Sequence, residues 1–260
     1  MKTIFTFFIS CLLFAGMIQA QPTPYRWTMT GGSDAADFGE GICTDDQGNA
    51  YVTGFVRGAA SIFGTDHTPA GTTNYMFLAK LSPNKELLWY VTAEASGSTG
   101  ASGFKTTYKN GYVYLLGDFR GDAVFHSTDL TTTPMASEYR ANFIARYSDT
   151  GVLDWIRKFE TSHTGGLVTT GSANNLVADS QGNVYFTTQF RTDINMAGTV
   201  LEPTTGGTNF YALVVKLDAL GAYQWHWNSV NAGDDRGEAI GLAPNGNVVF
   251  VTRFNSAITI

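Results

Sequence analysis

The sequence has few charged residues, and this scarcity narrows the fold class. Only 15% of its 260 residues are Asp, Glu, Lys or Arg, whereas about one quarter is usual in globular chains. Long solvent-exposed helices need charged side chains on their outer face, and there are too few here for several such helices. The 13% aromatic content excludes a disordered chain, because it supplies apolar surface that offsets the entropy of folding. The composition, with 29 glycines for turns, favours an all-β protein.

Cysteine and clustered positive charge are also scarce. Cys11 lies in the apolar N-terminal stretch and Cys43 is the other cysteine, so we expect no intrachain disulfide in the processed chain. Acidic residues outnumber basic residues by 22 to 16, and the sequence contains no run of Lys or Arg. We therefore expect neither nucleic acid nor an anionic membrane surface as a partner, because both bind clustered positive charge.

The first twenty residues have the pattern of an export signal. Lys2 is followed by an apolar run from Ile4 to Ile18 and then by the small residue Ala20. This order predicts a signal peptide over residues 1–20 that is cleaved after Ala20. The run is short for a transmembrane helix and no positive charge directly follows it. We therefore expect an exported mature chain (cell surface, extracellular medium or periplasm) without a membrane span.

Two motifs recur along the chain with the same period. One is a glycine that opens a strand-like stretch, and successive copies of this glycine lie 63, 71 and 64 residues apart. The other is a Lys or Arg placed nine residues before a tryptophan. Such periodicity indicates a repeat architecture. The glycines are Gly48, Gly111, Gly182 and Gly246, and the pairs are Lys80 with Trp89, Arg146 with Trp155 and Lys216 with Trp225.

Each repeat unit is predicted to form four short antiparallel strands joined by glycine turns. Aromatic and β-branched residues dominate these stretches, as is typical of half-buried strands. Residues 136–147 could form a helix in isolation, but their alignment with the third strand of a unit favours a strand. In the third unit the expected strands span residues 175–178, 184–190, 211–217 and 223–228.

Four such strands in each stretch of about 66 residues predict a β-propeller rather than a sandwich or a solenoid. We assign residues 21–260 to the propeller repeats and expect each unit's tryptophan to pack against the neighbouring blade. The unit boundaries are expected near Trp27, Trp89, Trp155 and Trp225.

The first unit contains several short motifs in a fixed order, and the fourth unit repeats part of them. In this combination, which covers nearly the whole mature chain, the sequence resembles the bacterial β-propeller repeats called SBBP. The resemblance implies a propeller fold. The motifs are Gly31–Asp34, Asp37 with Ile42, Asp45–Gly54 and Phe77–Ser82 in the first unit, and Asp235, Ile240, Gly246, Asn247, Val251 and Thr252 in the fourth.

The aspartate of this pattern is present in two units and absent from two. Asp37 lies eleven residues before Gly48, as Asp235 does before Gly246, whereas Gly100 and Gly171 replace it in the second and third units. A catalytic residue or an obligatory ligand would not be needed in only half of the units. We expect this aspartate to brace a loop as a hydrogen-bond acceptor.

The repeat count predicts an open ring. Residues 21–260 hold about 3.6 units, and the fourth unit reaches Ile260 just after its second strand. Propellers have roughly four to eight blades. We expect about 3.5 blades in an incomplete ring, and a full protein that continues for at least one more blade. The segment Trp27 to Met29 could supply one of the missing strands of the last blade.

No motif identifies an active site. The turns Asp45–Asn49 and Asp179–Asn183 are rich in oxygen ligands but lack the spacing of a calcium loop. Cys43 is predicted to be a small buried residue. The histidines show no metal-ligand spacing; they are His67, His126, His163 and His226. We predict no catalytic, cofactor-binding or metal-binding residue, and no cofactor.

Two turn segments, Asp149–Trp155 and Asp218–Trp225, resemble the docking turns of quinoprotein dehydrogenase propellers, which use a pyrroloquinoline cofactor and calcium. The similarity is confined to the turn and the packing tryptophan, and nothing in the chain resembles the cofactor site. It therefore supports the fold and not the chemistry.

Three segments distinguish the units from one another: Arg57–Asn74, Gly121–Arg140 and Arg191–Asn209. They are Thr- and Gly-rich, and we expect long loops that recognise a ligand, together with the mouth of the central channel. The predicted function is a non-catalytic interaction module whose partner is a protein or a polysaccharide. The alternative is a propeller enzyme, either a carbohydrate-active hydrolase or lyase or a quinoprotein-like oxidoreductase, with its active site in the channel or in missing blades.

Overall fold

The computed structural model describes residues 28–69, 71–161, 175–196, 198–202, 209–230 and 233–255. Within these ranges the regular secondary structure consists of β-strands only, and all paired strands run antiparallel. None of the described residues belongs to a helix that could cross a membrane. The predicted all-β class is therefore confirmed. The predicted signal peptide, Trp27 and His163 lie outside the described residues.

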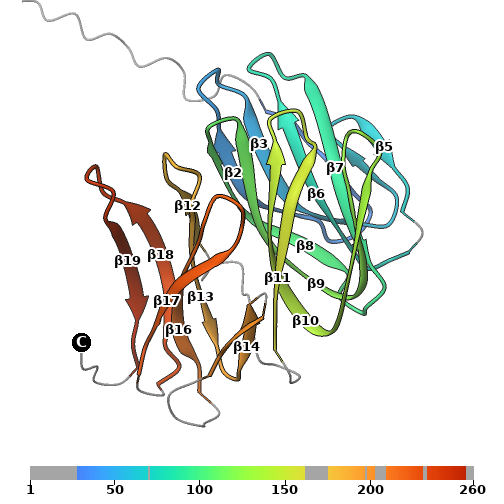
Figure 1. Cartoon of the computed structure of the whole chain (residues 1–260). Coiled ribbons are helices and arrows are strands. Elements are labelled where there is room, and N and C mark those ends of the chain that lie inside the picture. The colour runs from blue at the N-terminus through green and yellow to red at the C-terminus, as the bar shows by residue number, and fades with distance from the viewer. Residues whose placement is uncertain are drawn as a thin grey trace, which may run out of the picture.

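The main strands form four successive units, which cross the molecule in Figure 1 from the first (blue to cyan) to the fourth (dark red). The third unit has the predicted bounds, and residues 136–147 are part of a strand. The first unit comprises β2 (Phe38–Thr44), β3 (Ala50–Arg57), β6 (Asn74–Leu81) and β7 (Leu87–Ala95); the second β8 (Ala101–Lys109), β9 (Tyr112–His126), β10 (Thr132–Ser148) and β11 (Leu153–Thr161); the third β12 (Asn175–Ala178), β13 (Val184–Phe190), β16 (Tyr211–Leu217) and β17 (Tyr223–Asn228); the fourth β18 (Arg236–Leu242) and β19 (Val248–Arg253).

The three segments expected to be long loops contain β-hairpins, so that prediction was wrong. Threonine and alternating apolar residues suit paired strands as well as loops, and the composition could not separate the two. In the second unit, β9 and β10 extend into a long arm. The other two segments form β4 (Ala60–Ile62) with β5 (Thr65–His67), and β14 (Ile194–Met196) with β15 (Thr199–Leu201).

Two of these hairpins pair with the end of the fourth strand of the preceding unit. We call the fourth strand of a unit its outer strand and the first its inner strand. Ala95 of β7 pairs with Ala123 of β9, and Thr161 of β11 pairs with Ile194 of β14. The short strand β1 (Gly32–Ser33) pairs in the same way with β4. These pairings, which we call the latches, join consecutive units through main-chain hydrogen bonds. They merge the first two units and the β14–β15 hairpin into one ten-stranded sheet, where separate four-stranded units were expected.

Apolar side chains fill the space between consecutive units. Strand residues alternate between the two faces of a sheet, so each unit offers one apolar face to the unit before it and one to the unit after it. Between the first two units, Leu78 packs in one cluster with Leu115 and Phe143. The other two interfaces contain Tyr114, Ile144, Phe186 and Leu213, and Tyr185, Val214, Ile240 and Phe250.

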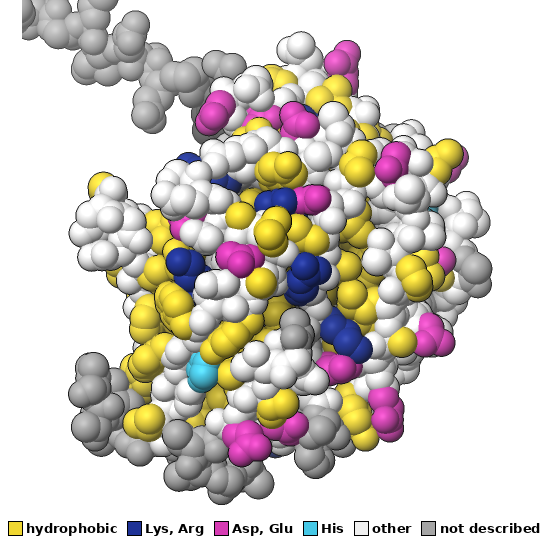
Figure 2. Space-filling view, viewed as in Figure 1, with side chains coloured by type: hydrophobic (Ala, Val, Ile, Leu, Met, Phe, Trp, Pro, Cys, Tyr) yellow, Lys and Arg dark blue, Asp and Glu magenta, His cyan; other side chains and the backbone are white. Residues whose placement is uncertain are grey.

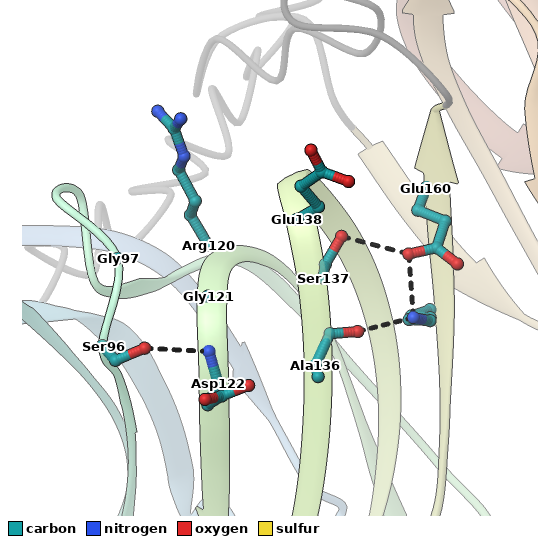
Figure 3. A pocket seen from close by; sticks show the side chains of 10 residues that line it. Ser96, Gly97, Arg120, Gly121, Asp122, Ala136, Ser137, Glu138 and Glu160 are labelled. Carbon is teal, nitrogen blue, oxygen red and sulfur yellow. Dashed lines mark hydrogen bonds and ion pairs between the residues drawn. The ribbon is translucent and has the colours of Figure 1, made fainter.

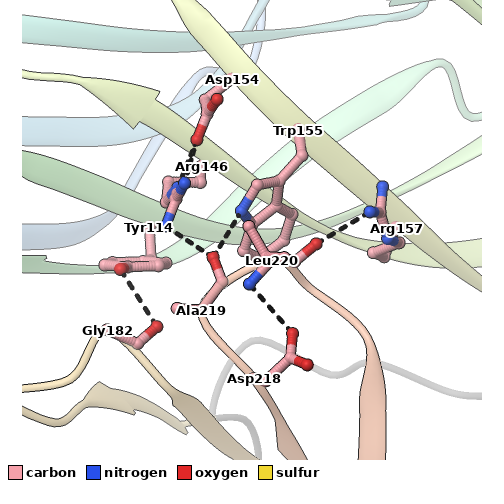
Figure 4. A network of polar contacts seen from close by, with 9 residues as sticks. All are labelled: Tyr114, Arg146, Asp154, Trp155, Arg157, Gly182, Asp218, Ala219 and Leu220. Carbon is pink, nitrogen blue, oxygen red and sulfur yellow. Dashed lines mark hydrogen bonds and ion pairs between the residues drawn. The ribbon is translucent and has the colours of Figure 1, made fainter.

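A tryptophan and a cation attach the outer strands of the first and second units to a turn of the next unit, as Figure 4 shows for the second unit. Trp155 Nε1 and Arg146 Nη1 both donate to the Ala219 carbonyl, at 3.1 and 2.6 Å. The indole lies against Gly221, where a Cβ would come within 2.9 Å of the ring. Gly221 has φ 76°, a left-handed conformation that glycine adopts without strain. The turn therefore offers both the acceptor and the space for the ring.

The same arrangement holds the first unit to the second. Trp89 Nε1 and Lys80 Nζ both donate to the Asp149 carbonyl, at 2.9 and 3.1 Å. Lys80 and Trp89 are direct cross-strand partners, as are Arg146 and Trp155, and a bulge follows each cation. This pairing explains the nine-residue spacing, and the predicted packing role is confirmed for both tryptophans.

In the second and fourth units, a glycine of the first strand allows close approach to the preceding unit. A Cβ at Gly103 would lie 2.0 Å from Thr53 Oγ1, and one at Gly237 would lie 1.8 Å from Thr187 Oγ1. Thr53 Oγ1 itself donates to the Phe77 carbonyl at 2.6 Å. Gly39 occupies the equivalent position in the first unit, but no atom lies within 4 Å of the place where a Cβ would be. The requirement for glycine therefore comes from unit docking and not from the strand.

Replacing Trp155 by Phe tests the indole contact. The change removes the donor to Ala219 and part of the packing, so we expect the free energy of unfolding to fall by about 2 kcal/mol in urea titrations followed by circular dichroism. The matched control is Trp225→Phe, because Trp225 is 38% exposed and donates no hydrogen bond among the described residues. Equal losses in the two variants would contradict the assigned role.

Replacing Gly103 by Ala tests the close approach of the second unit to the first. We expect a loss of about 2 kcal/mol, because the new methyl group must push Thr53 from its hydrogen bond. Gly39→Ala adds the same methyl group at the equivalent open position, and its free energy of unfolding should change by less than about 0.5 kcal/mol. Thermal or urea unfolding of both variants gives the comparison, and a tolerated Gly103→Ala would refute the contact.

Candidate functional site

A charged hollow of about 510 Å³ lies where β10 and β11 diverge. The two strands are paired up to Asn142 and Phe159, and beyond this point β10 follows the arm while β11 turns to β14. The separation of the strands opens the space between them. We call this hollow the charged groove, and its lining is Ser96, Gly97, Arg120, Gly121, Asp122, Ala136, Ser137, Glu138, Lys158 and Glu160.

Irregular backbone shapes one wall of the charged groove. The register of β9 and β10 shifts between Ser137 and Arg140, which places Glu138 in the irregular step. Opposite this step Gly121 has φ 84°, and a Cβ there would lie 2.6 Å from the Gly97 nitrogen. Glycine is therefore required at this position, where the arm passes the connection between the first two units.

Three side chains tie the two strands together across the floor of the groove (Figure 3). Lys158 Nζ donates to the Ala136 carbonyl at 2.5 Å and lies 2.8 Å from Glu160 Oε2. Ser137 Oγ donates to the same carboxylate oxygen at 3.1 Å. These three groups satisfy one another, so they fix the shape of the groove.

Arg120 and Asp122 are the charged groups of the groove without a partner among the described residues. In Figure 3 the Arg120 side chain extends away from Glu138 and Glu160. The Asp122 backbone N–H donates to Ser96 Oγ at 2.9 Å, while its carboxylate is exposed. Opposite charges are thus presented on either side of Gly121. Both groups can bind a ligand without first breaking a protein contact.

A second hollow of about 350 Å³ shares Lys158 and Glu160 with the charged groove. Its other lining residues come from β10, β11 and the β14–β15 hairpin, and they include Met135 and Arg157. Neither hollow is lined by an aromatic side chain. Charge and hydrogen bonds, rather than stacking on a ring, are therefore what this surface offers. Figure 2 shows basic and acidic side chains interspersed on the face it displays.

Arg120 belongs to a periodic set that the sequence analysis missed. Arg57, Arg120 and Arg191 each lie nine residues after the leading glycine of their unit, which is the signal that could have revealed them. Arg57 Nε donates to Asn74 Oδ1 at 2.6 Å, and the Arg191 guanidinium lies 4.6 Å from the Phe210 ring centroid. In the first and third units the arginine at this position thus contacts residues of its own unit, whereas in the second unit Arg120 lines the charged groove.

The repeated aspartates act as acceptors, as predicted. Asp37 Oδ1 accepts a hydrogen bond from the Arg57 backbone N–H at 2.9 Å, and its carboxylate also accepts bonds from Ser33. Asp235 Oδ1 accepts one from the Asn255 backbone N–H at 3.3 Å. Both carboxylates thus brace the backbone at the end of the second strand of their unit.

The oxygen-rich turns bind their own backbone. Asp45 accepts hydrogen bonds from the Gln47 and Asn49 N–H groups at 3.0 and 2.9 Å and from Asn49 Nδ2 at 2.8 Å. Burial alone would raise the pKa of Asp45, but these bonds and the charge of Lys80 outweigh burial and lower the pKa below its ordinary value. Asp179 makes the same contacts in the third unit. Among the described residues no group of three or more potential ligands could hold a metal ion.

The fold brings two histidines from different hairpins towards one carboxylate. His126 Nε2 lies 3.8 Å from Glu94 Oε1. His67 packs edge-on against Tyr75 and Tyr90, and burial lowers its pKa despite the nearby Glu94 charge. Sequence spacing could not show this proximity, because it arises from the meeting of the two hairpins.

Cys43 and His226 are partly shielded from solvent. Burial raises the pKa of the Cys43 thiol to about 11, so it stays protonated and unreactive at neutral pH. The thiol packs against the cluster between the first two units, as expected of a small apolar residue. His226 Nδ1 lies 2.7 Å from the Tyr223 hydroxyl, and burial lowers its pKa.

Comparisons with known proteins add little beyond this description. No family model matches the chain, and no curated protein matches it. Among solved structures, the chain is similar to virginiamycin B lyase from Staphylococcus aureus, with 12% sequence identity over 82% of this chain and 76% of that chain, and a TM-score of 0.30. A TM-score of this size supports no conclusion about activity.

Proposed function

We propose that this chain is an exported, non-catalytic β-propeller that acts as a cell-surface or secreted scaffold and binds a protein or polysaccharide in the charged groove. The architecture rests on four successive antiparallel units, of which the first three dock face to face through two equivalent tryptophans, Trp89 and Trp155. The resemblance to SBBP repeats supports the same architecture.

The proposed ring is open, with about 3.5 blades. The outward faces of the first and fourth units carry apolar side chains that the inner interfaces bury. Val249 and Val251 of β19 are both 57% exposed. Tyr51, the residue of the first unit that is equivalent to Val249, is fully buried. The two end faces are thus apolar, like the faces that pack between units inside the molecule.

The observation that carries the binding proposal is the pair of unpartnered charges, Arg120 and Asp122, on the wall of the charged groove. A ligand can bind these two charges without breaking a protein contact, and the cost is the ordering of each side chain, about 0.5–1.5 kcal/mol. The groove is lined by no histidine or cysteine. The base next to Ser137 is the Glu160 carboxylate, and its ion pair with Lys158 makes it a weak base for activating the serine. This composition suits recognition better than covalent catalysis.

The alternative is a carbohydrate-active enzyme, and one observation favours it. Glu138 and Glu160 both line the charged groove from neighbouring strands (Figure 3). Two carboxyl groups across a groove can serve as acid and base in glycoside cleavage. Against this assignment, Glu160 is held by Lys158 and Ser137.

Export is tested by the mass of the protein recovered from outside the cytoplasm. We expect a chain that starts at Gln21, because the small residue Ala20 fits the position before the cleavage site. Ala20→Tyr places a bulky side chain there and should leave the signal attached. Recovery of the unprocessed chain in the cytoplasm only would contradict export.

Ligand binding is tested on arrays of immobilised polysaccharides (cellulose, xylan and polygalacturonate) and of short synthetic peptides. We expect the wild-type protein to bind a subset of one class and Arg120→Ser to lower that affinity about tenfold, through loss of a charge-assisted hydrogen bond. Arg253→Ser is the matched control, because this arginine is exposed on the fourth unit.

Three outcomes decide the proposal. Binding that Arg120→Ser weakens and Arg253→Ser leaves unchanged supports the charged groove as the binding site. Absence of binding to both arrays, or equal binding by the two variants, rejects it. Release of reducing ends from a polysaccharide that Glu160→Gln abolishes would show the enzyme instead.

A further inference from the structure

The first unit has an apolar groove of about 390 Å³ on the face that points away from the second unit. Phe38, Phe55 and Phe77 line it from the sheet, and Met29 and Thr30 line it from the N-terminal side. Phe38 is 50% exposed. An open apolar surface of this kind usually has a binding partner.

The chain itself shows what covers such a face. By strand register, Val52 and Phe77 of the first unit correspond to Leu115 and Phe143 of the second. Leu115 and Phe143 are fully buried against the first unit, next to its outer strand β7. The equivalent cover for the first unit is an outer strand that precedes it in sequence.

The N-terminal residues are already in register to form that strand. Ser33 pairs with Ala60 as Ala95 pairs with Ala123 and Thr161 with Ile194. In the last two cases a tryptophan lies six residues before the paired residue, and Trp27 lies six residues before Ser33. If the segment that ends in β1 continues this pattern, Trp27 takes the position of Trp89 and Trp155.

The acceptor for this tryptophan is also present. The turn from Ser82 to Glu86 has the same backbone hydrogen bonds as the turns that receive Trp89 and Trp155: Ser82 N donates to Glu86 O at 2.9 Å and Lys85 N to Ser82 O at 3.1 Å. In this register Pro83 takes the place of Asp149 and Ala219. No described residue donates to the Pro83 carbonyl, and Pro83 is exposed.

We propose that residues 21–27 cover the apolar groove as an outer strand of their own chain, with Trp27 Nε1 donating to the Pro83 carbonyl. The occupant is this segment and not a second copy, because Met29 and Thr30 already line the groove and the chain continues from them. The proposal rests on the repeat geometry and is independent of any ligand.

This contact differs from the other two in the turn beneath the indole. Lys85 replaces Gly151 and Gly221 and keeps the left-handed conformation, with φ 72°. Its Cβ lies where the indole would touch glycine, so the ring must sit slightly further out, over the aliphatic stem. The position nine residues before Trp27, where the other units have a cation, is Ile18 of the predicted signal peptide, so the mature chain has no cation there. A single hydrogen bond therefore holds this strand instead of two.

Fluorescence of the purified protein tests the position of Trp27. The difference between the wild-type spectrum and that of Trp27→Phe gives the emission of Trp27. We expect blue-shifted emission and weak quenching by acrylamide. The difference for Trp225→Phe, from the 38% exposed Trp225, is the reference for a solvent-exposed indole. Quenching of Trp27 equal to or stronger than that of Trp225 would overturn the proposal.

A cross-link identifies the occupant. In a Trp27→Cys, Asn84→Cys variant, a short bismaleimide should cross-link the two new thiols within one chain, because it bridges the indole's length that a direct disulfide does not. The partly buried Cys43, whose thiol pKa is raised, should react more slowly. A cross-link between two chains would mean that a second copy covers the face, and absence of any cross-link would mean that residue 27 is not at the turn. Both results reject the proposal. Neither depends on ligand binding, so failure of the proposed function would leave this test unaffected.

Discussion

The structure depends on one carbonyl oxygen in the turn that precedes the outer strand of the second and of the third unit. This oxygen accepts hydrogen bonds from an indole and a cation of the previous unit, which are cross-strand neighbours. A main-chain acceptor cannot be lost by substitution, and the left-handed glycine beside it leaves room for the ring. The interaction therefore fixes both the distance and the angle between units, and the apolar faces fill what remains.

Much of this fold could be predicted, because the contacts that define it occur at fixed spacings. Lys80 and Trp89 are nine residues apart because they pair across a hairpin with a bulge. The hairpins within the long segments were missed, although a signal was present: Ala60, Ala123 and Ile194 each lie twelve residues after their leading glycine and form the latches. Their neighbouring sequences differ too much for composition alone to show this.

The charged groove could not have been located from the sequence. It exists because the part of β10 that precedes Asn142 is not paired with β11, and because the left-handed Gly121 lets the arm pass close to Gly97. Neither event changes a motif or a spacing. The proximity of His67 and His126 likewise follows from the meeting of two hairpins. The roles of Asp37 and Asp235 were predictable, since their presence in half of the units excluded chemistry.

The latches bear on how a gene of this type can lengthen. The second unit carries its own half of both joints: a turn and a hairpin that engage the first unit, and an indole, a cation and a strand end that engage the third unit. Tandem duplication of one coding segment would therefore insert a working module with both connectors in place. Natural selection could then alter a single copy, as at Arg120, without disturbing the joints of its neighbours.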